Sequence, residues 1–296
     1  MLRDRRSVLA AALVAVPAIL WGLWPTVLRP AGLAAIQAVL VVQLVQAAPA
    51  VVMGWRERAG FRDRGAVVAL LLFGLFDAAQ GALYFPALAR GPLAVAALTH
   101  YLGPVLVALA APFIPGERGS RRAMIAAPLS LLGLRLVMGP WNDAPVVTAL
   151  LGGGSAFFGA ASLFAVRRAG RSFSPLAICS LHAVVSALAI LLAFGRAAIP
   201  PWGMGVVGIA AASLVLGIGA SMIFFHAVKA VSAPVASVIT YVEPVTAVVM
   251  GWLVVGDKLG VMAIAGALVV IGAGVWVALE QAPAAVVGDA APRQAA

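Results

Sequence analysis

Ten stretches of this sequence run for about 20 residues or more with at most one charged side chain each. They cover residues 8–28, 30–55, 65–89, 91–116, 123–141, 144–166, 172–195, 197–228, 230–256 and 259–279. A membrane-spanning helix needs about 20 mostly apolar residues, whereas a spanning strand needs only about 9–11 of alternating polarity. Backbone groups in lipid must also be satisfied within the structure. We therefore expect an all-α integral membrane protein with ten transmembrane helices.

Composition excludes several classes of protein. Hydrophobic residues make up 64% of the 296 residues and charged residues 10%, against about 25% charged in typical soluble domains. Too few polar residues remain to cover a soluble core, which excludes a soluble enzyme, a disordered chain and a disulfide scaffold. The single cysteine, Cys179, rules out an intrachain disulfide, and the three histidines lack metal-ligand spacing. We expect no metal and no cofactor.

The positions of lysine and arginine predict the orientation. With the N-terminus inside, fifteen of these residues fall in inner segments, one lies within a run, and four fall in outer loops: Arg29, Arg90, Arg196 and Lys258. This bias places both termini in the cytoplasm of a multi-pass protein of the cell (inner) membrane. The net charge of +10 then reflects inner loops beside anionic headgroups, so no nucleic-acid partner is expected.

The sequence repeats itself at an offset of 140 residues. Residues 87–118 match residues 227–258 at seven of 32 positions, among them Tyr101 with Tyr241 and Pro104 with Pro244. Because each copy has five helices, the second copy is inserted upside down, and inverted repeats are typical of alternating-access transporters. We expect a cytoplasmic N-terminus (1–7), two inverted five-helix repeats (8–140 and 141–280) and a disordered cytoplasmic tail (281–296).

Three charged residues lie within apolar runs: Asp77, Arg135 and Glu243. A charge at the bilayer centre costs about 2.5–3.5 kcal/mol on insertion scales, so each needs a reason. Glu243 precedes Pro244, which weakens the helix there. It either binds a substrate amine or a proton, or is a structural carboxyl bonded to a neighbouring helix. Arg135 either snorkels to the interface or pairs with an embedded acid.

Asp77 begins a polar stripe on its helix. Gln80 follows at i+3 and Tyr84 at i+7, so the three share one helix face. The stripe is either a cavity wall that binds an ammonium group or relays protons, or a patch of hydrogen bonds between helices.

Two polar patches occupy equivalent places in the repeats. His100 and Tyr101 precede Gly103-Pro104, and Tyr241 precedes Glu243-Pro244. Kinked helices that meet across a pseudo-twofold axis are where inverted-repeat transporters build their sites. His100 titrates near neutral pH when unperturbed, although a neutral core histidine is an equal alternative. Asp77, Glu243 and His100 are the candidates for proton coupling.

At these motifs the chain resembles a known family. The matching residues are Trp21-Gly22, Gly103-Pro104 with Gly116-Glu117-Arg118, and Glu243-Pro244 with Gly256-Asp257-Lys258. Together they resemble the drug/metabolite transporter superfamily, of the EamA type, over nearly the whole chain. The resemblance implies ten helices, a central cavity with Trp21 as one wall, and export or exchange of small metabolites, amino acids among them. Asp257 departs from the Glu more common there.

We therefore expect a secondary transporter and not an enzyme. It would export amino acids or similar metabolites by alternating access around a midplane cavity lined by helices 1, 3, 4, 6, 8 and 9, with proton coupling as one means of drive. Its partners would be the lipid bilayer, a small-molecule substrate and a second copy in a homodimer. The alternatives are a membrane-embedded enzyme and a non-transporting structural or sensory bundle.

Overall fold

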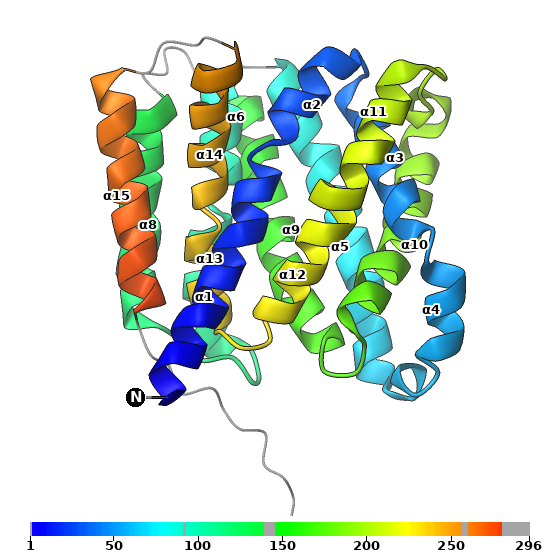
Figure 1. The fold of residues 1–296 in the computed structure, drawn as a ribbon, viewed down its shortest axis with the longest axis horizontal. Coiled ribbons are helices and arrows are strands. Elements are labelled where there is room, and N and C mark those ends of the chain that lie inside the picture. Colours follow the sequence, from blue (N-terminus) through cyan, green and yellow to red (C-terminus); the bar gives the residue numbers. More distant parts are fainter. Residues whose placement is uncertain (1, 91–92, 139–145, 256–259, 280–296) are drawn as a thin grey trace, which may run out of the picture.

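A computed structural model describes residues 2–90, 93–138, 146–255 and 260–279, and every predicted apolar run is helical there (Figure 1). In the first half the helices are α1 (Leu2–Trp21), α2 (Trp24–Ala31), α3 (Ala35–Ala47), α4 (Ala50–Arg56), α5 (Arg64–Arg90), α6 (Leu93–His100), α7 (Gly103–Ala110) and α8 (Arg121–Met138), with short 3-10 turns at Gly60–Arg62 and Ala111–Phe113. The tail (281–296) and the Gly256-Asp257-Lys258 motif lie outside the described residues.

The second half has the helices α9 (Val146–Ala169), α10 (Pro175–Phe194), α11 (Met204–Ala212), α12 (Ala220–Ala227), α13 (Ala233–Ile239), α14 (Val242–Met250) and α15 (Val261–Ala278). A 3-10 turn follows α10 at Gly195–Ala198, and π-helical turns occupy Ser213–Gly219 and Gly251–Val255. Several transmembrane segments therefore consist of two consecutive helices. α1 begins at Leu2, so it extends into the segment expected as a separate cytoplasmic N-terminus.

Nine segments of the described chain are long and apolar enough to span a membrane. The tenth, α8, is 18 residues long and carries Arg121, Arg122 and Arg135, which lower its hydropathy. Its tight packing against α15 is clear at Gly133 and Gly266. A Cβ added at Gly133 would lie 2.9 Å from the Gly266 carbonyl oxygen. Small residues that let helix backbones approach are typical of membrane interfaces, so α8 belongs to the bundle.

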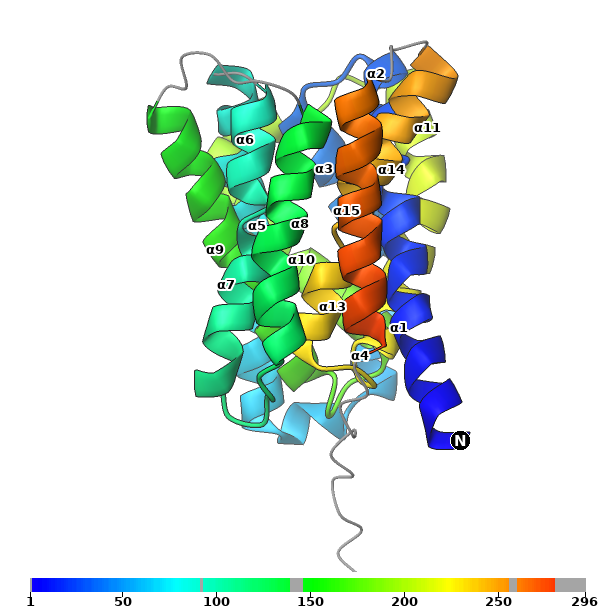
Figure 2. The same ribbon diagram turned by 90° about the vertical axis from the view of Figure 1, so that its left-hand side faces the viewer.

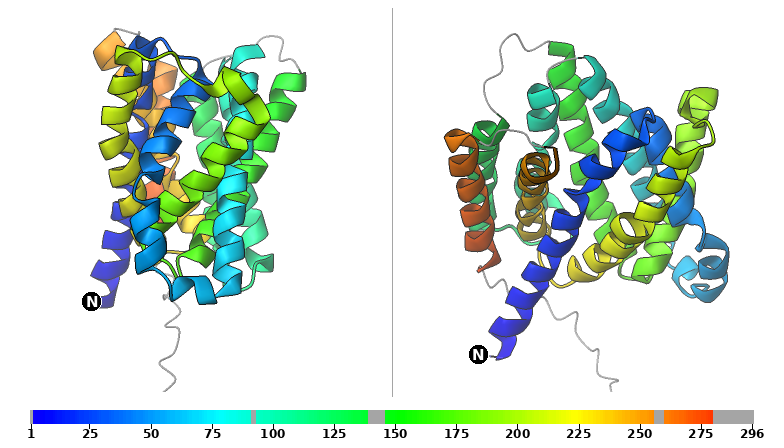
Figure 3. Two further views of the ribbon diagram at one scale, coloured as in Figure 1. Left: turned by 90° about the vertical axis from the view of Figure 1, so that its right-hand side faces the viewer. Right: turned by 45° about the horizontal axis from the view of Figure 1, so that its top comes forward.

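The two halves of the sequence interlock in space. α5 of the first half packs along α9 of the second, and α1 of the first half packs against α12 and α14 of the second (Figures 1 and 2). We call α5, α6, α7 and α9 the first bundle, and α1, α12, α13 and α14 the second bundle. The pair α8 and α15 lies on one flank, and α3, α4, α10 and α11 lie on the other (Figure 3).

The chain direction confirms the inverted relation of the halves. α1 starts at the lower end of the molecule in Figure 1, and α9 finishes at the same end, so the first helices of the two halves run in opposite directions. We call that lower end the N-terminal end. The fold is therefore a ten-segment, all-α membrane bundle built from two five-segment halves.

Candidate functional site

Both halves contain a helix that breaks at the same place. α6 ends and α7 begins around Tyr101-Leu102, while α13 ends and α14 begins around Thr240-Tyr241. Pro104 and Pro244 each sit at the start of the following helix, where a missing N–H group is tolerated. The predicted pair of kinked helices is thus present, and the two break points lie close together in the fold.

A cavity of about 220 Å³ lies between the two bundles at these breaks. Its wall includes Trp21 from α1, Gln80 from α5, residues of α6, α7 and α9, Phe224 from α12, and Glu243 from α14. The transmembrane segments that contribute are the first, third, fourth, sixth, eighth and ninth, as the sequence predicts. Among the predicted site residues, the lining contains Trp21, Gln80, His100, Tyr101, Pro104 and Glu243.

Glu243 is the one acidic side chain among the described lining residues, which include no lysine or arginine. It lies in the first turn of α14 and lines the same cavity as Tyr101 of the opposite bundle. The Tyr241 hydroxyl donates to the Tyr101 carbonyl oxygen over 2.7 Å, and Tyr241 is fully buried. Pro244 is buried beside Glu243 but does not line the cavity.

Trp21 and Gly22 fix α1 against the second half. The Trp21 indole N–H donates to the Leu216 carbonyl oxygen over 3.0 Å, inside the π-helical turn, and its ring meets Phe224 edge-on at 5.1 Å. A Cβ added at Gly22 would lie 2.6 Å from the Glu243 carbonyl oxygen. The Trp-Gly pair therefore supplies a cavity wall and lets α1 approach the carboxyl-bearing turn.

His100 sits in a polar and aromatic corner of the cavity. Its ring stacks on Tyr84 with 4.1 Å between centroids, and its Nδ1 lies 2.7 Å from the Ser155 hydroxyl oxygen. Ser155 donates its own proton to the Gly152 carbonyl oxygen. We therefore assign the ring hydrogen to Nδ1, which leaves Nε2 free to accept a proton or a substrate donor. Tyr84 contacts the His100 ring but is not itself a lining residue of the cavity.

Asp77 lies outside the cavity lining, contrary to one of the two interpretations of its sequence. Its Oδ2 accepts hydrogen bonds from Gln43 Nε2 at 2.5 Å and from the Ser186 hydroxyl at 2.9 Å. These partners belong to α3 and α10, on the flank that also contains α4 and α11. Gln80, about 60° away around the helix axis, faces Gly159 and the cavity instead. The predicted stripe is therefore divided between two sites.

The other embedded charge, Arg135, is half-buried on α8 and takes no part in the described cavity lining. No group of three or more His, Cys, Asp or Glu side chains that could hold a metal gathers anywhere in the described part of the chain.

One carboxyl outside the spans is strongly perturbed. The Arg168 guanidinium, the Ser172 hydroxyl and the Ala66 N–H hold the pKa of the Asp63 carboxyl well below its usual range. Arg168 Nη2 lies 2.7 Å from Asp63 Oδ1, and its Nη1 lies 3.0 Å from Oδ2. This bidentate pair joins the start of α5 to the end of α9 within the first bundle.

Comparison with known sequences decides the family. The sequence profile of the EamA-like transporter family matches residues 8–139 and again residues 146–279. The chain belongs to the EamA-like transporter family. This EamA-like protein is 28% identical over 218 residues to an uncharacterized transporter of Archaeoglobus fulgidus, covering 72% of this chain and 76% of the relative. A crystal structure described only as that of a protein superposes with a TM-score of 0.72 at 22% identity, covering 91% and 96% of the two chains.

Sequence reasoning missed several partners in this transporter. Ser155, which orients His100, and Gln43 and Ser186, which hold Asp77, are single polar residues in apolar helices. Their polarity in an uncharged run was the available signal. Which of them faces the cavity follows only from how α3, α9 and α10 pack.

Proposed function

We propose that this EamA-like transporter is an exporter of small metabolites, with amino acids or amino-acid-like compounds as the favoured class. The observation that carries the proposal is the cavity between two symmetry-related bundles, with Glu243 as its acidic group. Pockets for drug-sized ligands measure about 300–1,000 Å³. The present cavity is smaller, at about 220 Å³, which favours small metabolites over large drug-like molecules.

The lining supports recognition of an ammonium group. Glu243 provides a carboxyl, and Trp21, Tyr101 and Phe224 provide aromatic faces within the same wall. Carboxylates attract cations through charge, and aromatic faces attract them through the ring quadrupole. Nucleotide sugars are disfavoured because the described lining offers no lysine or arginine for their phosphates.

Alternating access is the mechanism that the inverted halves support. The two bundles would tilt about the cavity, so that the breaks at Tyr101-Leu102 and Thr240-Tyr241 act as flexible points. Because each bundle combines helices from both sequence halves, the moving units would be these bundles and not the two repeats as such. Proton coupling would run through Glu243, with His100 in the same cavity and Asp77 on the flank as further candidates.

The orientation and assembly are also proposals. We place both termini in the cytoplasm of a cell (inner) membrane, since the inner loops would hold most of the arginines. α15 exposes Val261, Met262 and Leu268 away from the bundle, and this face is where a second copy would pack in a homodimer. Transport by one chain is expected, because one chain supplies the cavity lining. No enzymatic activity is expected, because the family is one of transporters.

A comparison of exported metabolites tests the proposal. Cells expressing the parent protein, Glu243→Gln or Glu57→Gln would be compared by untargeted mass spectrometry of the medium. Glu57, the residue that caps α4, is a carboxyl outside the spans and serves as the matched control. We expect a defined set of compounds outside cells with the parent and with Glu57→Gln, and its loss with Glu243→Gln. The same exported metabolites at the same levels in the medium of cells with the parent and with Glu243→Gln, with both proteins present in the membrane, would contradict the proposal.

A further inference from the structure

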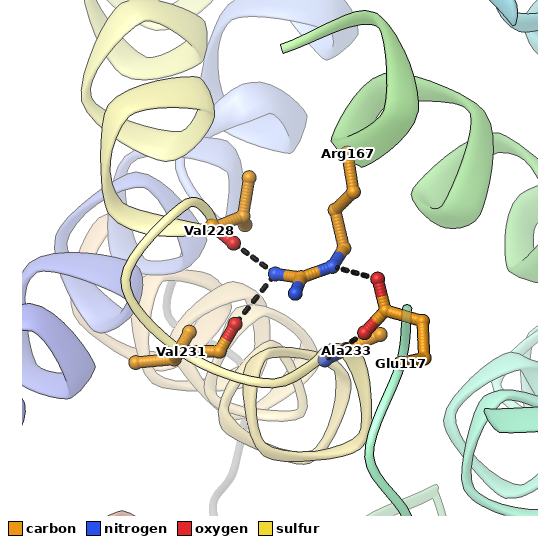
Figure 4. A network of polar contacts seen from close by, with 5 residues as sticks. All are labelled: Glu117, Arg167, Val228, Val231 and Ala233. Carbon is orange, nitrogen blue, oxygen red and sulfur yellow. Dashed lines mark hydrogen bonds and ion pairs between the residues drawn. The ribbon is translucent and has the colours of Figure 1, made fainter. Parts of the chain in front are cut away.

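A nearly buried ion pair lies where the two bundles meet, at the N-terminal end of the molecule (Figure 4). Arg167 Nε, at the end of α9, lies 2.6 Å from Glu117 Oε1 in the segment between α7 and α8. The Arg167 side chain is 15% exposed and that of Glu117 is 5% exposed. Because little water reaches the pair, its attraction is weakly screened, and removing one partner would strand a buried charge.

The same arginine also holds the second bundle. Its Nη1 donates to the carbonyl oxygen of Val228 and, over 2.5 Å, to that of Val231. Val228 follows the last turn of α12, whose final carbonyls have no partner within the helix. Arg167 and Glu117 both belong to the first-bundle side, and the loop 228–232 belongs to the second bundle. One planar guanidinium thus spans the junction between them (Figure 4).

Two further contacts strengthen the junction. Glu117 Oε2 accepts from the backbone N–H of Ala233, the first residue of α13, over 3.4 Å. Lys229 Nζ donates to the Phe173 carbonyl oxygen over 3.2 Å, and burial lowers the pKa of this lysine. The loop between α12 and α13 is therefore fixed to the end of α9 and to the segments that follow α7 and α9.

The junction covers one end of the cavity. Val166, which lines the cavity, immediately precedes Arg167 and is 2% exposed. Ser162, one turn earlier, also lines the cavity, and its hydroxyl is buried without a partner. A solute approaching from the N-terminal end would have to part Arg167 from the loop 228–232 to reach Glu243.

We propose that Arg167 and Glu117 form a latch that keeps the N-terminal end of the cavity closed, and that opening this end requires Arg167 to release the loop 228–232. The structure then represents the state closed at that end. The glutamate of the Gly116-Glu117-Arg118 motif then positions Arg167, which hydrogen-bonds to the opposite bundle. The inference rests on the proposed alternating access.

Cavity access can be measured without a substrate, which separates this inference from the proposed transport. Cys179→Ser removes the single cysteine, and Ser162→Cys then places a near-isosteric reporter in the cavity wall. Membrane vesicles of both orientations would be treated with a membrane-impermeant maleimide. A separate Ala59→Cys variant, exposed in the loop after α4, identifies vesicles that present the N-terminal end.

The variants tested on this background are Arg167→Met, Arg167→Lys, Glu117→Ala and Arg168→Met. Arg168 is the matched control, because it neighbours Arg167 and is also ion-paired, but its hydrogen bonds go to Asp63 of the first bundle and not to the loop 228–232. We expect Arg167→Met and Glu117→Ala to label at least about tenfold faster from the N-terminal end, as a shift of the closed–open equilibrium by about one decade predicts. Arg168→Met should label at the parental rate.

Arg167→Lys is the conservative variant, included in case Arg167→Met does not fold. It keeps the positive charge, but a lysine cannot reach Glu117 and both carbonyl oxygens together. It should label at an intermediate rate. Size-exclusion chromatography in detergent would establish which variants are folded. Parental labelling rates in every folded variant of Arg167 and Glu117 would overturn the latch. Equal acceleration in Arg168→Met would also overturn it, since the effect would then be general loosening.

Discussion

The hydroxyl of Tyr241 donates a hydrogen bond to the backbone carbonyl oxygen of Tyr101, and these two tyrosines are equivalent residues of the two repeats. Tyr241 thereby supplies a hydrogen-bond donor to a backbone carbonyl at the helix break between α6 and α7, in the other repeat. Tyr101 instead lines the cavity together with Glu243, whereas Tyr241 does not line it. A symmetric pair of residues has therefore been divided into one structural tyrosine and one that faces the site.

This division predicts different effects for the same substitution. Tyr241→Phe should lower the free energy of unfolding by about 0.6–2 kcal/mol, because a buried carbonyl loses its partner. Tyr101→Phe should change stability less and reduce transport more, since it removes the hydroxyl beside Glu243. Thermal unfolding in detergent and flux into liposomes would measure both. The reverse order of effects would contradict the assignment.

The two embedded carboxyls should also differ. Glu243→Gln should abolish flux driven by a pH gradient, because Glu243 lies in the cavity wall. Asp77→Asn should reduce flux at most partially, since Asp77 is held by Gln43 and Ser186 on the flank. Proteoliposomes with an imposed pH gradient would measure this. Unchanged pH-driven flux in both variants would exclude these carboxyls from proton coupling.

Two adjacent glycines of α9 give a stringent test of packing. A Cβ at Gly152 would collide with the Thr99 hydroxyl and lie 2.8 Å from the Ala96 carbonyl oxygen, whereas one at Gly153 would meet nothing within 4 Å. Gly152→Ala should destabilise the protein by about 1–3 kcal/mol through overpacking. Gly153→Ala should be neutral or slightly stabilising, because alanine favours helix. Chemical unfolding in mixed micelles would compare them, and equal stabilities would refute the predicted contact of α9 with α6.

The ion pair at Asp63 predicts a pH dependence of stability. Its pKa is lowered in the folded protein, so the carboxylate stabilises the fold above its unfolded pKa of about 3.9. That stabilisation is lost as the pH falls further towards the folded pKa. The unfolding temperature of the parent should therefore drop below about pH 4 more steeply than that of Asp63→Asn. Parallel curves for the two proteins would show that the pair contributes nothing.

The sequence predicted the fold well because hydropathy determines it. Apolar runs marked each transmembrane segment, and Pro104 and Pro244 marked the two helix breaks because proline lacks the N–H group that a helix interior needs. Trp21, His100 and Glu243 line one cavity. The repeat pointed to His100 and Glu243, the family resemblance pointed to Trp21, and their role in transport stays a prediction. α8 was expected as a span from its length, although its three arginines lower its hydropathy.

Long-range side-chain partners could not be predicted in the same way. Arg167 read as one of many inner positive charges, yet it pairs with Glu117, 50 residues away, and with the loop after α12. The sequence suggested Asp77 as a cavity residue because helical periodicity shows which residues share a helix face. It does not show which neighbouring helix that face contacts. The packing of α5 between α9 and α10 decides that contact, and packing between distant helices leaves little trace in one sequence.

The most direct test of the account is flux of an identified metabolite in proteoliposomes. Purified parent protein, Glu243→Gln and Glu57→Gln would each be reconstituted at equal density, with protein-free liposomes for comparison. The account predicts saturable uptake or counterflow of a small amine-bearing compound with the parent and with Glu57→Gln, and flux near the protein-free level with Glu243→Gln. Flux by Glu243→Gln equal to that of the parent would contradict the claim that this cavity is the transport site.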